Sequence, residues 1–100
     1  MSRLDDSGVA QALRQTPGWE RAGSEIRRTY RFKDFREALA FVNRVGDLAE
    51  RAGHHPDIDI RYTKVTFSLS THDAGGITQA DLDLAKAIEG AAGFDQKAGV

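Results

Sequence analysis

The chain has 100 residues, 40% of them in the apolar set AVILMFWYC and 10 of them glycine, which is typical of one small folded domain covering residues 1–100. Its formal net charge of −1 gives no overall attraction to nucleic acid or to an anionic membrane, and the lack of cysteine excludes disulfides and thiolate chemistry. No stretch of apolar residues is long enough for a membrane span or a signal peptide, so we expect a cytoplasmic protein that does not bind membranes.

The first third of the chain predicts a short helix and then a β-hairpin. Apolar residues at helical spacing predict a helix over about residues 5–15, which Pro17 and Gly18 end. Gly23 and Ser24 fit a two-residue turn. The strand that follows alternates between inward and outward positions, and its inward residues are Ile26, Arg28, Tyr30 and Phe32.

The next segment, KDFREALAFVNRVGDLAERAG, changes to a helical period. Asp34 and Glu37 have the spacing of a capping box, and Gly53 supplies a C-terminal stop. These signals predict a helix that begins after Asp34 and ends at Gly53. Its expected buried stripe consists of Phe35, Ala38, Leu39, Val42, Val45 and Ala49.

Residues 57–70 return to a period of two and predict a second hairpin that turns on Thr63 and Lys64. Residues whose numbers sum to 127 then face each other. This register places Ile58, Ile60 and Tyr62 on the same face as Val65, Phe67 and Leu69, and it predicts that Ile58 lies in the core. It also places His55 opposite His72, with Cβ atoms about 4.5–5.5 Å apart.

The last segment predicts a helix capped by Thr78, with residues 96–100 frayed. Its expected buried stripe is Leu82, Ala85, Ile88 and Ala92. The element order is therefore α-β-β-α-β-β-α. Two hairpins indicate a four-stranded antiparallel sheet with three helices packed on one face, an α+β fold.

The only three histidines, His54, His55 and His72, fall at the two ends of the second predicted hairpin. Imidazoles exchange protons near neutral pH, so a cluster of two or three favours general acid–base catalysis. A three-histidine metal site is the alternative, although adjacent histidines rarely point at one ion. A nucleophilic serine is less well supported, because Ser68 and Ser70 are not in a nucleophile elbow.

These histidines belong to a longer pattern of seven positions in the segment 50–81. It reads Glu50, three residues, His54-His55-Pro56, five residues, Tyr62, nine residues, His72, eight residues, Asp81. The pattern resembles the signature of the pterin-4a-carbinolamine dehydratases, the family also known as dimerisation cofactor of a hepatocyte transcription factor. The segments LRQTPGWE and STHDAGGITQADLDLAKAIE also resemble the family, so the likeness covers nearly the whole chain.

The resemblance implies removal of water from a 4a-hydroxytetrahydropterin, which gives the quinonoid dihydropterin for reductive recycling after aromatic amino-acid hydroxylation. It implies no metal or redox cofactor. It assigns proton transfer to His54 and His72, and binding and orientation of the pterin to His55. The strand register instead pairs His55 with His72, so the division of labour among the three is open at this point.

Four further residues are candidate site residues under this resemblance. Glu50 is expected to orient or tune His54, or else to be a solvated helix charge. Asp81 is expected near the site, and it also occupies the capping position three residues after Thr78. The backbone or hydroxyl groups of Ser70 and Thr71 are expected to bind the pyrimidine edge of the pterin. Animal members carry an aromatic residue at the position of Ile58, so the expected stacking residue is missing there.

The resemblance also concerns partners. Family members form homodimers or homotetramers, often through sheet edges and the helix near the middle of the chain, and a functional link to an aromatic amino-acid hydroxylase is expected. Some members act as non-catalytic protein-binding modules, as a coactivator or assembly factors. The basic and aromatic segment 21–36 is an alternative nucleic-acid strip, but its aromatic residues are needed for the core, so we expect no nucleic-acid binding.

Overall fold

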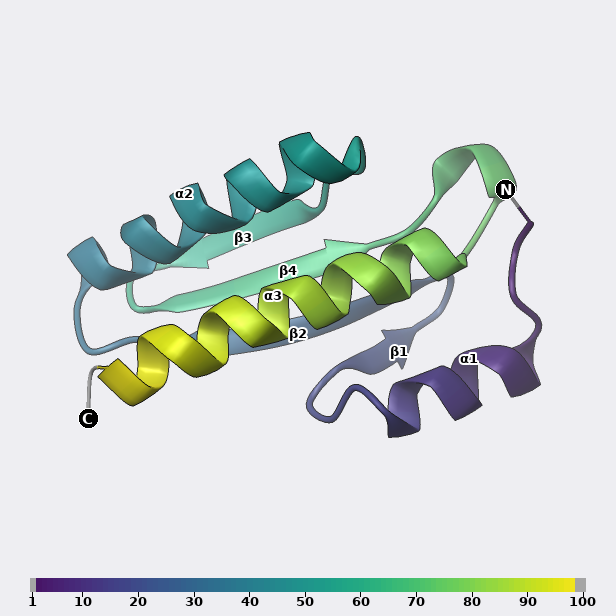
Figure 1. Ribbon diagram of the computed structural model, residues 1–100, viewed down its shortest axis with the longest axis horizontal. Helices are drawn as coiled ribbons and strands as arrows, with labels where there is room; N and C mark the ends of the chain where they lie inside the picture. Colours follow the sequence, from purple (N-terminus) through teal and green to yellow (C-terminus); the bar gives the residue numbers. More distant parts are fainter. Residues whose placement is uncertain (1, 99–100) are drawn as a thin grey trace.

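The computed structural model describes residues 2–98, with side chains described up to residue 93. The predicted order of helices and strands is confirmed (Figure 1). The elements are α1 (Asp6–Arg14), β1 (Glu20–Ala22), β2 (Glu25–Arg31), α2 (Phe35–Ala52), β3 (Asp57–Arg61), β4 (Lys64–Leu69), the short 3₁₀ helix η1 (His72–Ala74) and α3 (Gln79–Ala98).

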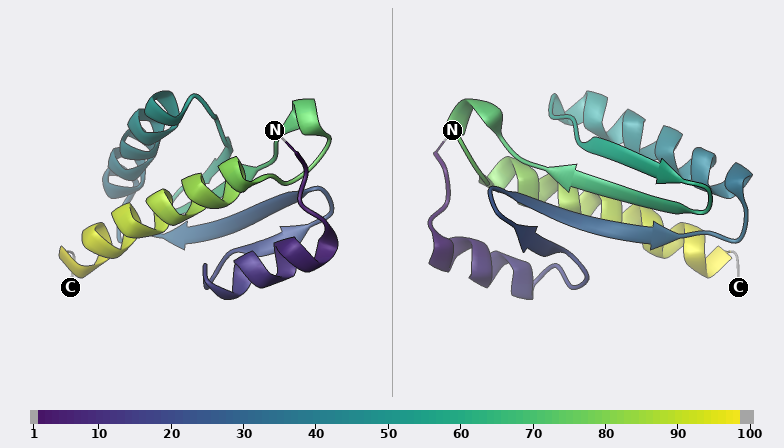
Figure 2. Two further views of the ribbon diagram at one scale, coloured as in Figure 1. Left: turned by 45° about the vertical axis from the view of Figure 1, so that its right-hand side comes forward. Right: turned by 180° about the vertical axis from the view of Figure 1, so that it is seen from behind.

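The four strands form one antiparallel sheet in the order β1-β2-β4-β3. Strands β2 and β4 are central, while β1 and β3 are the two edges. The helices lie on one face of this sheet, with α2 beside β3, α3 across the central strands and α1 beside β1 (Figures 1 and 2). This arrangement confirms the predicted α+β fold.

The core lies between the central strands and α2 and α3. Three aromatic rings, those of Tyr30, Phe41 and Phe67, pack edge to face with centroids 5.3 to 5.9 Å apart. The Tyr30 hydroxyl donates a hydrogen bond to Glu89 Oε1 at 2.5 Å, which joins β2 to α3. Burial, and then the neighbouring Glu89 carboxylate, raises the pKa of Tyr30, so the phenol stays a donor.

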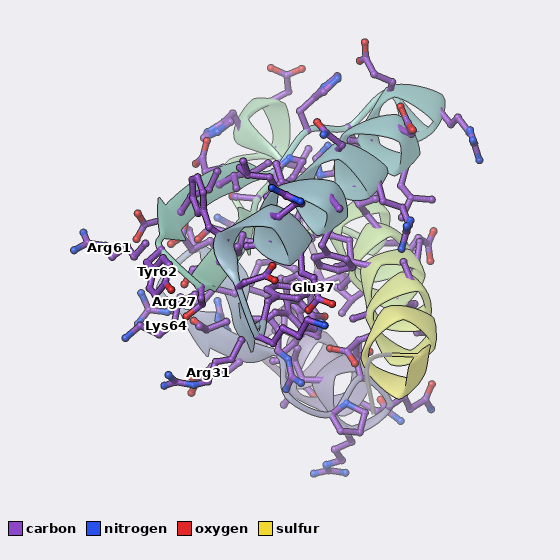
Figure 3. The ribbon with its side chains drawn as sticks, turned by 90° about the vertical axis from the view of Figure 1, so that its left-hand side faces the viewer. Arg27, Arg31, Glu37, Arg61, Tyr62 and Lys64 are labelled. Carbon is purple, nitrogen blue, oxygen red and sulfur yellow. The ribbon has the colours of Figure 1, made fainter. Side chains whose placement is uncertain are left out.

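The opposite face of the sheet carries polar side chains. In Figure 3, Arg27, Arg31, Arg61 and Lys64 project from the strands on the side away from the helices. The hydroxyls of Thr29 and Thr66 are hydrogen bonded to each other at 2.7 Å between them. Inward and outward residues therefore alternate along β2 and β4 as the period of two predicted.

The predicted buried stripe of α2 is partly wrong. Ala38, Val45 and Ala49 are buried as expected, but Phe41, which the stripe omitted, is also buried. Phe35 is 45% exposed and Leu39 is 37% exposed. The physical reason is that apolar residues occupy more of the helix circumference than the contact with sheet and α3 covers.

The predicted register of the second hairpin is also wrong: Ile60 pairs with Val65 and not with Phe67, a shift of two residues. Arg61 pairs with Lys64, so the turn residues are Tyr62 and Thr63. Tyr62 takes a left-handed conformation, with φ of 53°, as a tight turn of this kind requires. The pairing still places Ile58 and Ile60 on the face of Phe67 and Val65, because a shift of two residues keeps each side chain on the same face of the sheet.

Two further expectations drawn from this hairpin also fail. Ile58 is 38% exposed and does not lie in the core, because β3 is an edge strand that the helices leave partly uncovered. His55 does not face His72 across a strand pair. The chain enters β3 only at Asp57, after Pro56, while His72 has already left β4 and begins η1.

The two ends of α2 follow the predicted signals. Asp34 Oδ1 accepts a hydrogen bond from the Glu37 N–H at 2.8 Å. At the other end Gly53 has φ of 63°, its N–H bonds the Glu50 carbonyl, and the His54 N–H bonds the Ala49 carbonyl, both at 3.2 Å. This pair of bonds is a Schellman motif, and it fixes the direction in which His54 leaves the helix.

Helix α3 buries the four predicted residues, Leu82, Ala85, Ile88 and Ala92. It continues to Ala98, so the expected fraying of residues 96–100 falls partly outside the described residues. Within residues 2–98, no helix combines the length and the apolar character needed to cross a membrane.

The left-handed glycine at the end of α2 gives a test with a matched control. A Cβ at Gly53 or at Gly90 would meet no atom within 4 Å, but only Gly53 has a positive φ. Gly53→Ala is therefore expected to lower the free energy of unfolding by about 1–2 kcal/mol. Gly90→Ala, inside α3, is expected to raise it by up to about 1 kcal/mol. Urea denaturation measures both, and changes of the same sign would contradict this account.

Candidate active site

The three elements that carry the candidate residues meet at one end of the molecule. These are the C-terminal end of α2, the C-terminal end of β4 with the loop after it, and the N-terminal end of α3 (Figure 1). Residues that are far apart in the sequence thus come together where two helices and a strand end. Such a position exposes side chains to solvent while the elements behind them stay fixed.

His54 and Asp81 form the central contact of this region. His54 Nε2 is hydrogen bonded to Asp81 Oδ1. The Asp81 side chain is fully buried and that of His54 is 17% exposed. An ionised carboxylate only accepts hydrogen bonds, so this contact places a proton on His54 Nε2 and leaves Nδ1 as the other working nitrogen.

Asp81 has a second set of partners on its other oxygen. Oδ2 accepts hydrogen bonds from the Thr71 hydroxyl and from the Thr78 N–H, each at 2.9 Å. The Thr78 contact is the reciprocal half of a capping box at the start of α3. Asp81 therefore caps α3 and also contacts His54, one of the candidate site residues.

Thr78 is the residue that sequence analysis missed as a member of this region. It was expected only to cap α3, yet its side chain is buried and its hydroxyl lies 2.8 Å from that of Thr71. The pattern Thr-x-x-Asp identified the cap. No pattern in the sequence indicated that Thr71 would lie beside it.

His55 and Glu50 form a separate pair on the surface. His55 Nε2 lies 2.5 Å from Glu50 Oε2, and their side chains are 61% and 77% exposed. Glu50 was expected to act on His54, but it contacts the next histidine instead. The pair lies at the end of α2, where His55 is next in sequence to the partly buried His54.

His72 is exposed and opens η1 directly after Thr71. The chain thus places it one residue from the Thr71 hydroxyl that bonds Asp81. Ser70, just before, donates its hydroxyl to the Ser24 carbonyl at 2.8 Å. The loop thus contacts Asp81 through Thr71, whereas the predicted direct pairing of His55 with His72 is absent.

A groove of about 430 Å³ lies on another side of the same loop. The three histidines are not among the residues that line it, which are Arg3, Leu4, Asp5, Asp6, Arg21, Gly23, Ser24, Gly75, Gly76 and Ile77. In the described part of the chain, no group of three or more His, Cys, Asp or Glu side chains is arranged to hold a metal ion.

The arrangement suits proton transfer at a surface. The imidazole of His54 is held by a buried carboxylate, and the exposed imidazoles of His55 and His72 follow the ends of α2 and β4. A histidine oriented in this way on one nitrogen can act as general acid or base through the other.

The sequence matches the family model described as "Pterin 4 alpha carbinolamine dehydratase" over residues 2–91. A protein from Thermomicrobium roseum, named "Putative pterin-4-alpha-carbinolamine dehydratase", is 59% identical over 88 residues, which cover 88% of this chain and 95% of that protein. A protein of the same name from Nocardia farcinica is 56% identical over 86 residues, which cover 86% of this chain and 90% of that protein.

Solved structures show the same fold. The crystal structure of a transcriptional coactivator/pterin dehydratase from Brucella melitensis superposes with a TM-score of 0.87 at 33% identity, covering 91% of this chain and 99% of that chain. A pterin dehydratase-like RuBisCO assembly factor of the alpha-carboxysome superposes with a TM-score of 0.66 at 24% identity, covering 77% of this chain and 92% of that chain, and supports the fold alone. With a family model matched over nearly its full length and close relatives of the same size, this chain belongs to the pterin-4-alpha-carbinolamine dehydratase family.

Proposed function

We propose that the protein is a 4a-hydroxytetrahydropterin dehydratase that works by histidine acid–base catalysis. The observation that carries the proposal is the contact between His54 and the buried Asp81 carboxylate, in a chain that belongs to this family. The product, a quinonoid dihydropterin, would be returned to the tetrahydro form by a reductase. The proposal thus places the protein in pterin recycling beside an aromatic amino-acid hydroxylase.

The reaction needs one proton donor and one proton acceptor. The C4a–O bond breaks as the leaving hydroxyl takes a proton and departs as water, while a ring N–H of the pterin gives up its proton. We assign these two transfers to His54, through Nδ1, and to His72. No change of oxidation state occurs, so the two imidazoles are sufficient for the chemistry.

His55 is proposed to bind and orient the pterin. It is exposed and adjacent to His54 in the sequence, and its Nε2 lies 2.5 Å from Glu50 Oε2. A histidine held by a carboxylate presents its second nitrogen in a defined direction. The Ser70 hydroxyl already donates a hydrogen bond to the Ser24 carbonyl, so it has less hydrogen-bonding capacity for the pterin edge than the sequence suggested.

The catalytic proposal is tested with freshly generated 4a-hydroxytetrahydropterin, whose dehydration is followed by ultraviolet absorbance. His54→Ala and His72→Ala are each expected to lower kcat by about 10²- to 10⁴-fold, because each removes one proton-transfer group. His55→Ala is expected mainly to raise KM. A metal chelator is expected to leave the rate unchanged.

Two results would contradict this proposal. Activity that a chelator abolishes and added metal restores would favour a metal mechanism. A correctly folded wild type with no activity would favour the alternative, a protein-binding module on the same fold. Circular dichroism of every variant separates loss of catalysis from loss of folding.

We also propose that the protein forms a homodimer through β3 and the adjoining side of α2. Four large apolar side chains are partly exposed there, and we call them the apolar margin: Phe35, Leu39, Ile58 and Ile60. The pairing places Ile58 and Ile60 on the helix side of the sheet. Because β3 is an edge strand, its outer N–H and C=O groups are open to another strand.

The position of Glu37 shows that the α2 residues of the apolar margin, Phe35 and Leu39, lie on the same side as its β3 residues. In Figure 3, Glu37 lies on the side of α2 that faces α3. Each residue of an α-helix is rotated by about 100° from the one before it. Leu39 and Phe35 are each two residues from Glu37, so both lie about 200° around the helix from it, on the flank away from α3. That flank is the one beside β3, which supports one continuous apolar surface.

The sequence of β3 is self-complementary, which favours a second copy as the occupant of this surface. In the antiparallel register that sets Ile60 against Ile60 of the second copy, Asp59 faces Arg61 of the second copy. Both of these residues are exposed on the open face. Opposite charges and apolar residues would then pair across the two-fold axis. A homotetramer would need a further surface.

The dimer proposal is tested by sedimentation velocity over a range of concentrations. Wild type is expected to sediment as a dimer or larger, and Ile60→Lys as a monomer, because a charge would be buried at the axis. Gln11→Lys, an exposed position on α1, is the control and is expected to behave as wild type. A wild type that stays monomeric would rule out the second copy as the partner of this surface.

A further inference from the structure

Thr71 and Thr78 form a closed hydrogen-bonded ring around one oxygen of Asp81. The Thr71 hydroxyl and the Thr78 N–H both donate to Oδ2 at 2.9 Å, and the two threonine hydroxyls are 2.8 Å apart. Because the Thr71 hydroxyl proton goes to Asp81, the Thr78 hydroxyl donates to Thr71. Thr78 and Asp81 are both fully buried, so water does not replace these bonds.

The backbone N–H and carbonyl of Thr71 are hydrogen bonded as well. Its N–H donates to the Gly76 carbonyl at 2.9 Å. Its carbonyl accepts from the N–H groups of Ala74 at 3.0 Å and Gly76 at 3.3 Å. Every polar group of Thr71 thus has a partner within the protein, which argues against the expectation that Thr71 binds the pterin.

We infer that Thr71 is instead a positioning residue, whose hydroxyl fixes the Asp81 carboxylate and thereby the orientation and tautomer of His54. The inference rests on the proposed dehydratase function. Without the Thr71 hydroxyl, Oδ2 keeps only the Thr78 N–H, and the buried Thr78 hydroxyl loses its acceptor. The carboxylate can then turn, and Oδ1 no longer holds His54 Nε2 in one direction.

The test compares Thr71→Val, which keeps the shape but removes the hydroxyl, with Thr71→Ser, which keeps the hydroxyl. Thr29→Val is the matched control, since it removes a threonine–threonine hydrogen bond on the open sheet face, away from the site. Ring ¹⁵N chemical shifts of His54 report its tautomer in the free protein. The dehydration assay gives kcat and KM for the same four proteins.

Wild type, Thr71→Ser and Thr29→Val are expected to show His54 with its proton on Nε2. Thr71→Val is expected to show a mixture of tautomers and a kcat about 10- to 100-fold lower, the range for a lost hydrogen bond to a charged group, with KM nearly unchanged. Thermal melting checks that the variant is folded. If Thr71→Val unfolds, Thr71→Ser still tests the inference, because a His54 tautomer that differs from that of the wild type in this variant would contradict it.

The inference is overturned if Thr71→Val keeps the His54 tautomer of the wild type, or if Thr71→Val raises KM while kcat stays the same, which would make Thr71 a substrate ligand. The tautomer measurement needs no activity. An inactive wild type whose His54 tautomer still responds to Thr71→Val would therefore end the dehydratase proposal and leave the positioning role in place.

Discussion

The arrangement of this end of the molecule depends on one fully buried carboxylate. A buried charge costs several kcal/mol unless it is paired and hydrogen bonded. Asp81 meets that cost with three donors, and each comes from a different part of the chain: His54 after α2, Thr71 after β4, and the Thr78 N–H at the start of α3. The ends of two helices and a strand must therefore stay together for the charge to be satisfied.

This constraint explains how a small domain can hold the proposed catalytic histidine in place. His54 is fixed at its backbone by the Schellman motif that ends α2 and at its ring by Asp81. His55, the next residue along the chain, and His72, in η1, are both exposed. The oriented imidazole of His54 and the accessible imidazoles of His55 and His72 suit a substrate that binds from solvent and needs proton transfer at two positions.

The sequence predicted the elements well because their signals are local. Asp34 and Gly53 define α2, and Gly23 with Ser24 defines the first turn, each through its own backbone preferences. The second hairpin was placed wrongly because Tyr62 adopts a left-handed conformation that its residue type does not suggest. The contact of Thr71 with Asp81 could not be predicted, since it depends on the register and on the short bridge between Thr71 and Gly76. Phe35 and Ile58 were assigned to the core because an apolar pattern does not distinguish a core from an uncovered edge.

The central claim is that catalysis takes place at His54, on the side of the ring away from Asp81. The most direct measurement is a crystal structure of the protein with an unreactive reduced pterin bound. The account predicts the pterin ring within hydrogen-bonding distance of His54 Nδ1, with His72 on its other side and Asp81 still bonded to Nε2. A pterin bound in the groove between Arg3 and Arg21, with His54 remote from it, would contradict the account.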